Sequence, residues 1–268
     1  MLLIKTILHI LPSLLVTTFF ANSINRSGVL VCYGKLKPEN IKGYSYVILE
    51  SKYYLPSDIR VLKSNNDTVF AYLSLGEVNA NASHYEELKN AILGKNEIWN
   101  SYYLDLKSEK TKQIIMQIIE NTLELGYDGL FFDNIDNFST HGPQKDQKLE
   151  LIALLKTIKE KYPKKKFIQN SGLDLVSETS SYINAIVVES VASNYTFNNK
   201  SYKLRNNKDF ETYMLRLKSI SESFQIPVIL IEYANSEILF NEIVKRIAPS
   251  NFEYFIGNID LQNIPKFK

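Results

Sequence analysis

The sequence contains little of the chemistry on which disulfide and metal sites depend. It has a single cysteine, Cys32, so neither an intramolecular disulfide nor a cysteine-rich zinc site can form. Its three histidines, His9, His84 and His141, lie far apart in the sequence, which argues against a histidine-rich metal cluster. We therefore expect no metal and no other cofactor.

Excess charge of one sign is also lacking. The 31 lysines and arginines nearly balance the 29 aspartates and glutamates, for a net charge of +2, so no overall field draws the protein onto nucleic acid. A hydrophobic content of 45% is too high for a disordered chain and too low for a protein with many membrane spans. No linker rich in proline or serine interrupts the chain, which predicts one domain and, in our interpretation, a monomer.

The N-terminus has the pattern of an export signal. Lys5 precedes the apolar residues 7–20, and the small residues of Ala21-Asn22-Ser23 follow at positions that signal peptidase favours. The apolar run is shorter than the roughly 20 residues of a membrane span. We predict a signal peptide at residues 1–23, a mature domain at residues 24–268, and a secreted or periplasmic protein without stable membrane insertion. The alternative is an uncleaved N-terminal anchor.

Short apolar runs alternate with segments of helical periodicity along the rest of the chain. Most of the runs are continuously apolar, as in parallel strands that are covered on both faces. The expected strands are Val29–Tyr33, Tyr46–Glu50, Val69–Ser74, Gly129–Asp133, Phe167–Asn170, Ala185–Glu189, Val228–Glu232 and Tyr254–Gly257. The expected helices are Ser57–Ser64, His84–Leu93, Glu109–Leu125, Lys148–Lys161, Lys208–Phe224 and Ser236–Ile247.

Eight strands with helices between them predict an α/β fold, a single (β/α)8 TIM barrel. We place Tyr102–Leu106 in the connection before the Glu109 helix rather than in a ninth strand. The alternative, a doubly wound open sheet, fits less well because no glycine-rich phosphate loop follows the first strand.

Acidic residues recur at or just past the ends of the expected strands. In a barrel these positions open onto one face, where active sites are built. A single carboxylate after a strand is more often a helix cap, but Asp133 and Glu189 each end a strongly apolar run, where an idle carboxylate would be costly. The acidic residues at these positions are Glu50, Glu77, Asp133, Asp136, Glu189 and Glu232.

Two such carboxylates favour glycoside hydrolysis, which needs one carboxylic acid and one carboxylate. A serine hydrolase is disfavoured because the sequence has no G-x-S-x-G elbow. A hard cation held by Asp133, Asp136 and Glu189 remains a weaker alternative, because oxygen-ligand sites usually have a denser acidic loop.

Five ordered blocks resemble a known family. They are AYLSLGE (residues 71–77), GYDGLFFDNID (126–136), QNSG (169–172), VVES (187–190) and PVILIEY (227–233). Together they resemble glycoside hydrolase family 114, the endo-α-1,4-polygalactosaminidases and the hydrolase domains that act on Pel-type galactosamine-rich exopolysaccharide. The sequence departs from the family pattern at Glu50 and Glu232, where many relatives carry aspartate.

The resemblance implies that Asp133 and Glu189 are the catalytic pair, which we interpret as nucleophile and general acid/base of a retaining mechanism. The expected partner is a polysaccharide built from cationic amino sugars. We expect Glu50, Glu77, Asp136 and Glu232 to attract its ammonium groups. The aromatic rings of Tyr33, Tyr72 and Tyr233 are expected to pack on its sugars, and Asn170 to orient a hydroxyl or the acid. A catalytically silent barrel that binds a glycan or serves as a scaffold is the alternative.

Overall fold

The computed structural model describes residues 28–267, and the predicted signal peptide and His9 lie outside this range. The central element is one sheet of eight strands in the order β1-β2-β3-β7-β8-β9-β12-β13, in which each strand pairs in parallel with the next. The strands are β1 (Val29–Cys32), β2 (Tyr46–Leu49), β3 (Val69–Ser74), β7 (Gly129–Asp133), β8 (Lys166–Asn170), β9 (Ala185–Glu189), β12 (Val228–Tyr233) and β13 (Glu253–Gly257).

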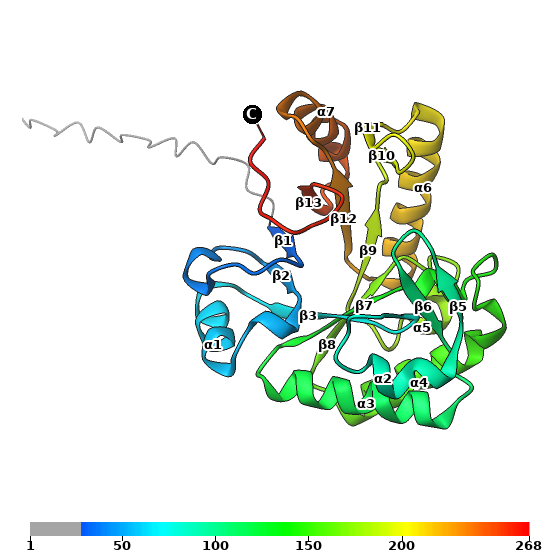
Figure 1. Cartoon of the computed structure of the whole chain (residues 1–268). Coiled ribbons are helices and arrows are strands. Elements are labelled where there is room, and N and C mark those ends of the chain that lie inside the picture. The colour runs from blue at the N-terminus through cyan, green and yellow to red at the C-terminus, as the bar shows by residue number, and fades with distance from the viewer. Residues whose placement is uncertain (1–27, 268) are drawn as a thin grey trace, which may run out of the picture.

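The first and last strands lie side by side, so the sheet is nearly closed into a barrel (Figure 1). Just past the ends of β1 and β13, the Tyr33 amide donates a hydrogen bond of 2.7 Å to the Leu261 carbonyl. Close packing requires glycine here, because a Cβ added at Gly34 would lie 2.0 Å from the Gln262 carbonyl oxygen. The predicted TIM-barrel architecture is therefore confirmed, and the strand ends meet at one mouth.

Helices with one apolar stripe cover the outside of the barrel. The stripe of α3 (Glu109–Glu124) places Ile115 and Ile119 four residues apart in the core, and Ser108 caps its first turn by accepting from the Thr111 amide. The other covering helices are α1 (Pro56–Asn65), α4 (Lys148–Lys161), α6 (Asn207–Phe224), α7 (Glu237–Ile247) and the single turn α5 (Val176–Thr179). No helix in residues 28–267 is long and apolar enough to cross a membrane.

The structure corrects the prediction for the segment between β3 and α3. The expected helix His84–Leu93 forms only the single turn α2 (Tyr85–Leu88) and the 3-10 turn η3 (Lys89–Ala91). The chain then enters β5 (Ile92–Asn96), because this strand pairs with β6 (Ser101–Leu104), which in turn pairs with β4 (Glu77–Asn79). Tertiary pairing overrides local periodicity here, so part of Tyr102–Leu106 is a strand, although it lies outside the barrel.

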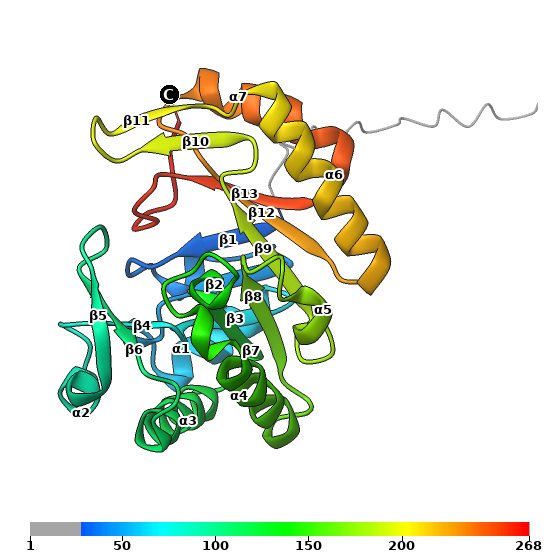
Figure 2. The same ribbon diagram turned by 90° about the vertical axis from the view of Figure 1, so that its right-hand side faces the viewer.

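A second hairpin, also unpredicted, follows β9. It consists of β10 (Ser193–Thr196) and β11 (Ser201–Leu204), paired antiparallel. Figure 2 shows this hairpin and the β4-β6-β5 sheet on the same side of the barrel, at the left of the view. The remaining 3-10 turns are η1 (Pro38–Asn40), η2 (Ser51–Tyr53), η4 (Ile135–Phe138), η5 (Lys145–Gln147) and η6 (Ala248–Ser250).

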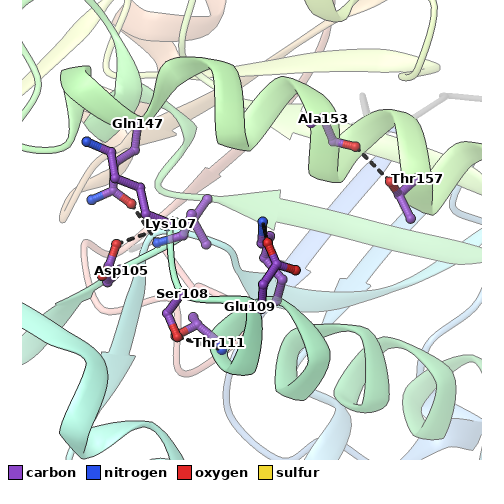
Figure 3. Close-up of polar contacts among 10 residues, drawn as sticks. Asp105, Lys107, Ser108, Glu109, Thr111, Gln147, Ala153 and Thr157 are labelled. Carbon is purple, nitrogen blue, oxygen red and sulfur yellow. Dashed lines mark hydrogen bonds and ion pairs between the residues drawn. The ribbon is translucent and has the colours of Figure 1, made fainter.

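The buried side-chain amides of Gln144 and Gln147 fix the start of α4 to the β6–α3 connection, and Figure 3 shows the contact of Gln147. The Gln147 Oε1 atom accepts a hydrogen bond of 2.6 Å from the Leu106 amide, and the Gln144 side chain donates one of 2.7 Å to the Leu104 carbonyl. Both glutamines are almost fully buried. The end of β6 is therefore held by side chains of the neighbouring barrel unit.

We expect Gln147→Ala to lower the free energy of unfolding by about 1–3 kcal/mol, because it leaves the buried Leu106 amide without its acceptor. Thr157→Ala, in the helix α4 that follows Gln147, is the control, because the Thr157 hydroxyl is exposed and bonds only the Ala153 carbonyl one turn earlier (Figure 3). That change should stay within about 0.5 kcal/mol. Urea unfolding of both variants measures the difference, and equal stability would contradict the anchoring role of Gln147.

Candidate active site

Four neighbouring strands deliver polar side chains to the mouth of the barrel. Asp133, Asn170, Glu189 and Tyr233 are the last residues of β7, β8, β9 and β12, which are adjacent in the sheet. Their side chains line a cleft of about 1340 Å³. This exceeds the roughly 300–1,000 Å³ typical of sites for one drug-sized ligand, so the cleft has room for several sugar units.

The backbone turns sharply directly after three of these residues. Asn134, Ser171 and Ser190 follow Asp133, Asn170 and Glu189, and their φ angles of 60°, 57° and 56° lie in the left-handed region. Residues other than glycine rarely adopt this conformation, and it concentrates at functional sites. The repeated turn ends each strand so that its last side chain stands at the rim of the cleft.

The Asn170 amide connects the two predicted catalytic carboxylates. Its Nδ2 atom donates one hydrogen bond of 2.8 Å to Asp133 Oδ1 and another of 2.7 Å to Glu189 Oε1. Both bonds start from one nitrogen. The distance between these two carboxylate oxygens therefore cannot exceed the combined length of the two hydrogen bonds. Retaining glycosidases hold their carboxyl groups about 5–5.5 Å apart, whereas inverting enzymes need about 6.5–9.5 Å.

Tyrosine hydroxyls bond the opposite oxygens of the pair. Tyr72 donates a hydrogen bond of 2.8 Å to Asp133 Oδ2, and Tyr233 donates one to Glu189 Oε2. Burial beside these carboxylates raises the pKa of both tyrosines well above its usual value, so they keep their protons and remain donors. Tyr33 packs against Tyr72 with the ring centroids 4.6 Å apart, which fixes the ring of Tyr72.

The environment of Glu189 suits an acid that works near neutral pH. Its pKa is raised to about 7. Burial is the largest cause, and the negative charge of Asp133 acts in the same direction. Hydrogen bonds from Tyr233 and Asn170 stabilise the charged form and oppose the shift. Glu189 therefore holds its proton up to about pH 7, at the end of a strand whose other residues are buried.

Acidic side chains outnumber lysines and arginines in the rest of the cleft. Glu50 and Asp136 both line it, and burial raises the pKa of each. Two further carboxylates that were not predicted, Glu87 on α2 and Asp260 after β13, also line the cleft. Within the described chain, Lys52 is the one lysine or arginine among the lining residues. The cleft thus favours a cationic ligand.

Asp260 follows its strand as the predicted acids follow theirs. A search for acidic residues just past the expected strands could therefore have identified it. Glu87 carries no such signal, because it lies in a segment whose sequence predicts an ordinary surface helix.

Two predicted substrate-binding carboxylates have structural partners. Glu232 is fully buried, does not line the cleft, and accepts hydrogen bonds from the amides of Val191, Ala192 and Ser193 and from the Ser193 hydroxyl. The prediction that it binds substrate is therefore wrong: Glu232 holds the segment that follows Glu189.

Glu77 forms part of the cleft wall, but its oxygens accept from the side chains of Asn96, Ser101 and Asn137. It connects the β4-β6-β5 sheet to the turn after β7, so its carboxylate is already engaged by the protein. In residues 28–267, no group of three or more histidine, cysteine, aspartate or glutamate residues is placed to hold a metal ion.

Comparison with known proteins relates the chain to glycoside hydrolases by sequence and by fold. The sequence model of glycoside hydrolase family GH114 matches residues 46–267. The glycoside hydrolase domain of PelA from Pseudomonas aeruginosa has a similar structure, with a TM-score of 0.78 and 22% identity over 88% of this chain and 96% of that one. Ega3 from Aspergillus fumigatus, solved with galactosamine, has a TM-score of 0.67 and 16% identity over 90% and 93% of the two chains.

The α-galactosidase TtGalA from Thermus thermophilus is more distant, with a TM-score of 0.55 and 10% identity over 89% of this chain and 58% of that one. No curated protein sequence matches the chain. At these identities the structural matches establish the fold.

Two substitutions should move the pKa of Glu189 in opposite directions. Asp133→Asn removes a negative charge that raises this pKa, so the pKa should fall below about 7. Tyr233→Phe removes a hydroxyl donor that lowers it, so the pKa should rise above about 7. Carbon-13 NMR of the glutamate side-chain carboxyls measures both shifts, with Glu189→Gln identifying the resonance. A shift of the same sign in both variants would contradict the arrangement described here.

Proposed function

The chain belongs to glycoside hydrolase family GH114, and from this premise we propose that it cleaves α-1,4-linked galactosamine-containing polysaccharide by a retaining mechanism. The observation that carries the mechanism is the Asn170 amide, which bonds both Asp133 and Glu189. The close approach of these two carboxylates fits direct attack by one of them better than attack by an interposed water. Export of the protein, based on residues 1–23, is part of the same proposal.

In the first step, the carboxylate of Asp133 attacks the anomeric carbon while Glu189 gives its proton to the leaving oxygen. The bond between sugar and leaving group breaks, and a glycosyl ester on Asp133 forms. Asp133 Oδ2 is the attacking atom in this proposal, because it accepts one hydrogen bond, from Tyr72, whereas Oδ1 accepts from both Asn170 and the Asn134 amide. A carboxylate oxygen with one hydrogen bond retains a lone pair for the sugar.

In the second step, the ionised Glu189 takes a proton from water, and the water oxygen displaces Asp133 from the anomeric carbon. This step restores the proton of Glu189 and the charge of Asp133. A pKa of about 7 suits both halves of the cycle, because the group is then a usable acid and a usable base near neutral pH.

The charge of the cleft supports a cationic substrate. A deacetylated galactosamine unit carries an ammonium group, and Glu50, Asp136, Glu87 and Asp260 line the cleft around the catalytic pair. The structure of Ega3 with galactosamine concerns a protein of the same fold. An amino-sugar polymer is therefore the substrate class that this cleft fits best.

Substitution of the two carboxylates separates their roles. Glu189→Gln should lower kcat on α-1,4-polygalactosamine by about 100-fold or more, because general acid catalysis is lost. On a galactosaminide whose leaving group needs no protonation, the first step should proceed almost normally. Asp133→Asn should be inactive on both substrates, because nothing remains to form the ester.

Release of reducing ends and of the activated leaving group measures these effects. Glu253→Gln is the matched control, since Glu253 is exposed at the start of β13, at the opposite end of the barrel from the cleft. Equal residual turnover of the activated substrate by both active-site variants would refute the assigned roles. Absence of activity in the unmodified protein on every galactosamine polymer would refute the proposed function.

Binding to the acidic cleft should depend on ionic strength. Because salt screens charges beyond about 8 Å at 0.15 M, affinity for a galactosamine oligomer should fall as sodium chloride is added, and Glu50→Gln should weaken both the affinity and its salt dependence. Full N-acetylation removes the positive charges and should weaken binding too. Calorimetric titration of the Asp133→Asn variant measures this without cleavage. Salt-independent binding that prefers the acetylated oligomer would contradict electrostatic recognition.

A further inference from the structure

Two hairpins inserted at different points of the barrel meet through their tips. Trp99 lies in the turn between β5 and β6, and Phe197 lies in the turn between β10 and β11. Their rings form an edge-to-face pair with centroids 5.3 Å apart. The hairpins follow β3 and β9, between which β7 and β8 lie in the sheet, so the contact spans the side of the mouth where Asp133 and Asn170 stand. We call this contact the aromatic bridge.

Both hairpins are fixed to the active site. In the first, the buried Glu77 of β4 accepts hydrogen bonds from Ser101, the β6 residue next to the turn, and from Asn137 of the turn after β7. At the base of the second, the Arg205 guanidinium donates two hydrogen bonds, of 2.9 and 2.8 Å, to the carbonyl of Ser190, the residue after Glu189. The positions of both tips are therefore set by the same strand ends that carry the catalytic pair.

The two rings are too exposed for an ordinary packing contact. The solvent-exposed fraction is 51% for Trp99 and 44% for Phe197. In an edge-to-face pair, each ring keeps at least one face that its partner does not cover. Trp99 also lines the cleft that contains Asp133 and Glu189. An exposed indole face is thus available to a molecule in this cleft.

The ring belongs to an inserted hairpin and not to a strand end that carries a reacting group. The amide of Leu104, at the end of β6 farther from the turn, bonds the Gly76 carbonyl just past β3, and β6 runs from there to Ser101, next to the turn that holds Trp99. At about 3.3 Å per residue, this part of β6 spans roughly 10 Å between the Gly76 contact and the turn. We therefore assign a group packed on Trp99 to a different sugar unit from the one that reacts.

We propose that Trp99 is a binding subsite for an amino-sugar unit of the polymer, held under the aromatic bridge and outside the unit being cleaved. This inference rests on the proposed function. An indole face can pack on the apolar face of a pyranose ring, and tryptophan is the best aromatic partner for an ammonium group. Phe197 orients the indole from the other hairpin. The bridge selects a chain of several units over a single sugar.

Trp99 is the one tryptophan of the chain, so the intrinsic tryptophan fluorescence reports on this residue alone. In the Asp133→Asn variant, an α-1,4-galactosamine oligomer should shift the emission to shorter wavelength, because the sugar removes water from the indole. The shift should saturate together with binding measured by calorimetry. Free galactosamine, which can fill the reacting position alone, should produce a much smaller shift.

An unchanged emission spectrum at calorimetric saturation would overturn the subsite while leaving the proposed function intact. Absence of any calorimetric binding of galactosamine oligomers would instead refute the proposed function, and the subsite with it.

Kinetics of the unblocked enzyme give the second readout. Trp99→Ala should raise KM for the polymer about tenfold more than KM for a single activated galactosaminide, Phe197→Ala should act in the same direction, and Trp99→Phe should recover part of the loss. Ile98→Ala is the matched control, since Ile98 is the adjacent turn residue, is 65% exposed and does not line the cleft. An equal KM for the polymer in Trp99→Ala and Ile98→Ala would overturn the proposal.

Discussion

The arrangement of the proposed catalytic pair depends on one side-chain amide, that of Asn170, which bonds a carboxylate on each neighbouring strand. Two carboxylates this close repel each other, and each would lose hydration in the cleft. The amide offers one hydrogen to each, while Tyr72 and Tyr233 bond the outer oxygens. The barrel makes this possible because β7, β8 and β9 are adjacent and parallel, so their last residues stand side by side. Burial and the charge of Asp133 then raise the pKa of Glu189 to about 7, which suits the acid/base role proposed for it.

The barrel alone would leave this pair in an open mouth. Insertions after β3 and β9 add two hairpins, and buried carboxylates fix both to the strand ends: Glu77 through Ser101 and Asn137, and Glu232 through the segment after Glu189. Glu232 does not line the cleft, and Glu77 in the cleft wall is engaged by protein partners. The other acidic residues of the cleft supply its charge. Carboxylates with structural partners and carboxylates open to the cleft thus occur at the same end of the barrel.

The barrel strands and the meeting of Asp133 and Glu189 at one mouth could be predicted from the sequence, because strands buried on both faces appear as continuous apolar runs. The roles of Glu189 and Glu232 could not be separated in this way, since both follow apolar runs. Register separates them: Ile231 pairs with Glu189, so Tyr233, two residues further along β12, shares the face of Glu189, while Glu232 points the other way. The β4-β6-β5 sheet escaped prediction for a similar reason. Its strands are stabilised by pairing across the chain, and the local periodicity of residues 84–93 favours a helix.

In the proposed mechanism, the amide-linked carboxylates act as nucleophile and acid/base across a short separation. The stereochemistry of the first product is the sharpest test of these roles, because attack by Asp133 followed by water inverts the anomeric carbon twice. Proton NMR of the newly formed reducing end, recorded during hydrolysis of an α-1,4-galactosamine oligomer and before mutarotation, identifies the anomer. We predict the α anomer as the first product. Initial release of the β anomer would show a single displacement by water and would contradict the role given to Asp133.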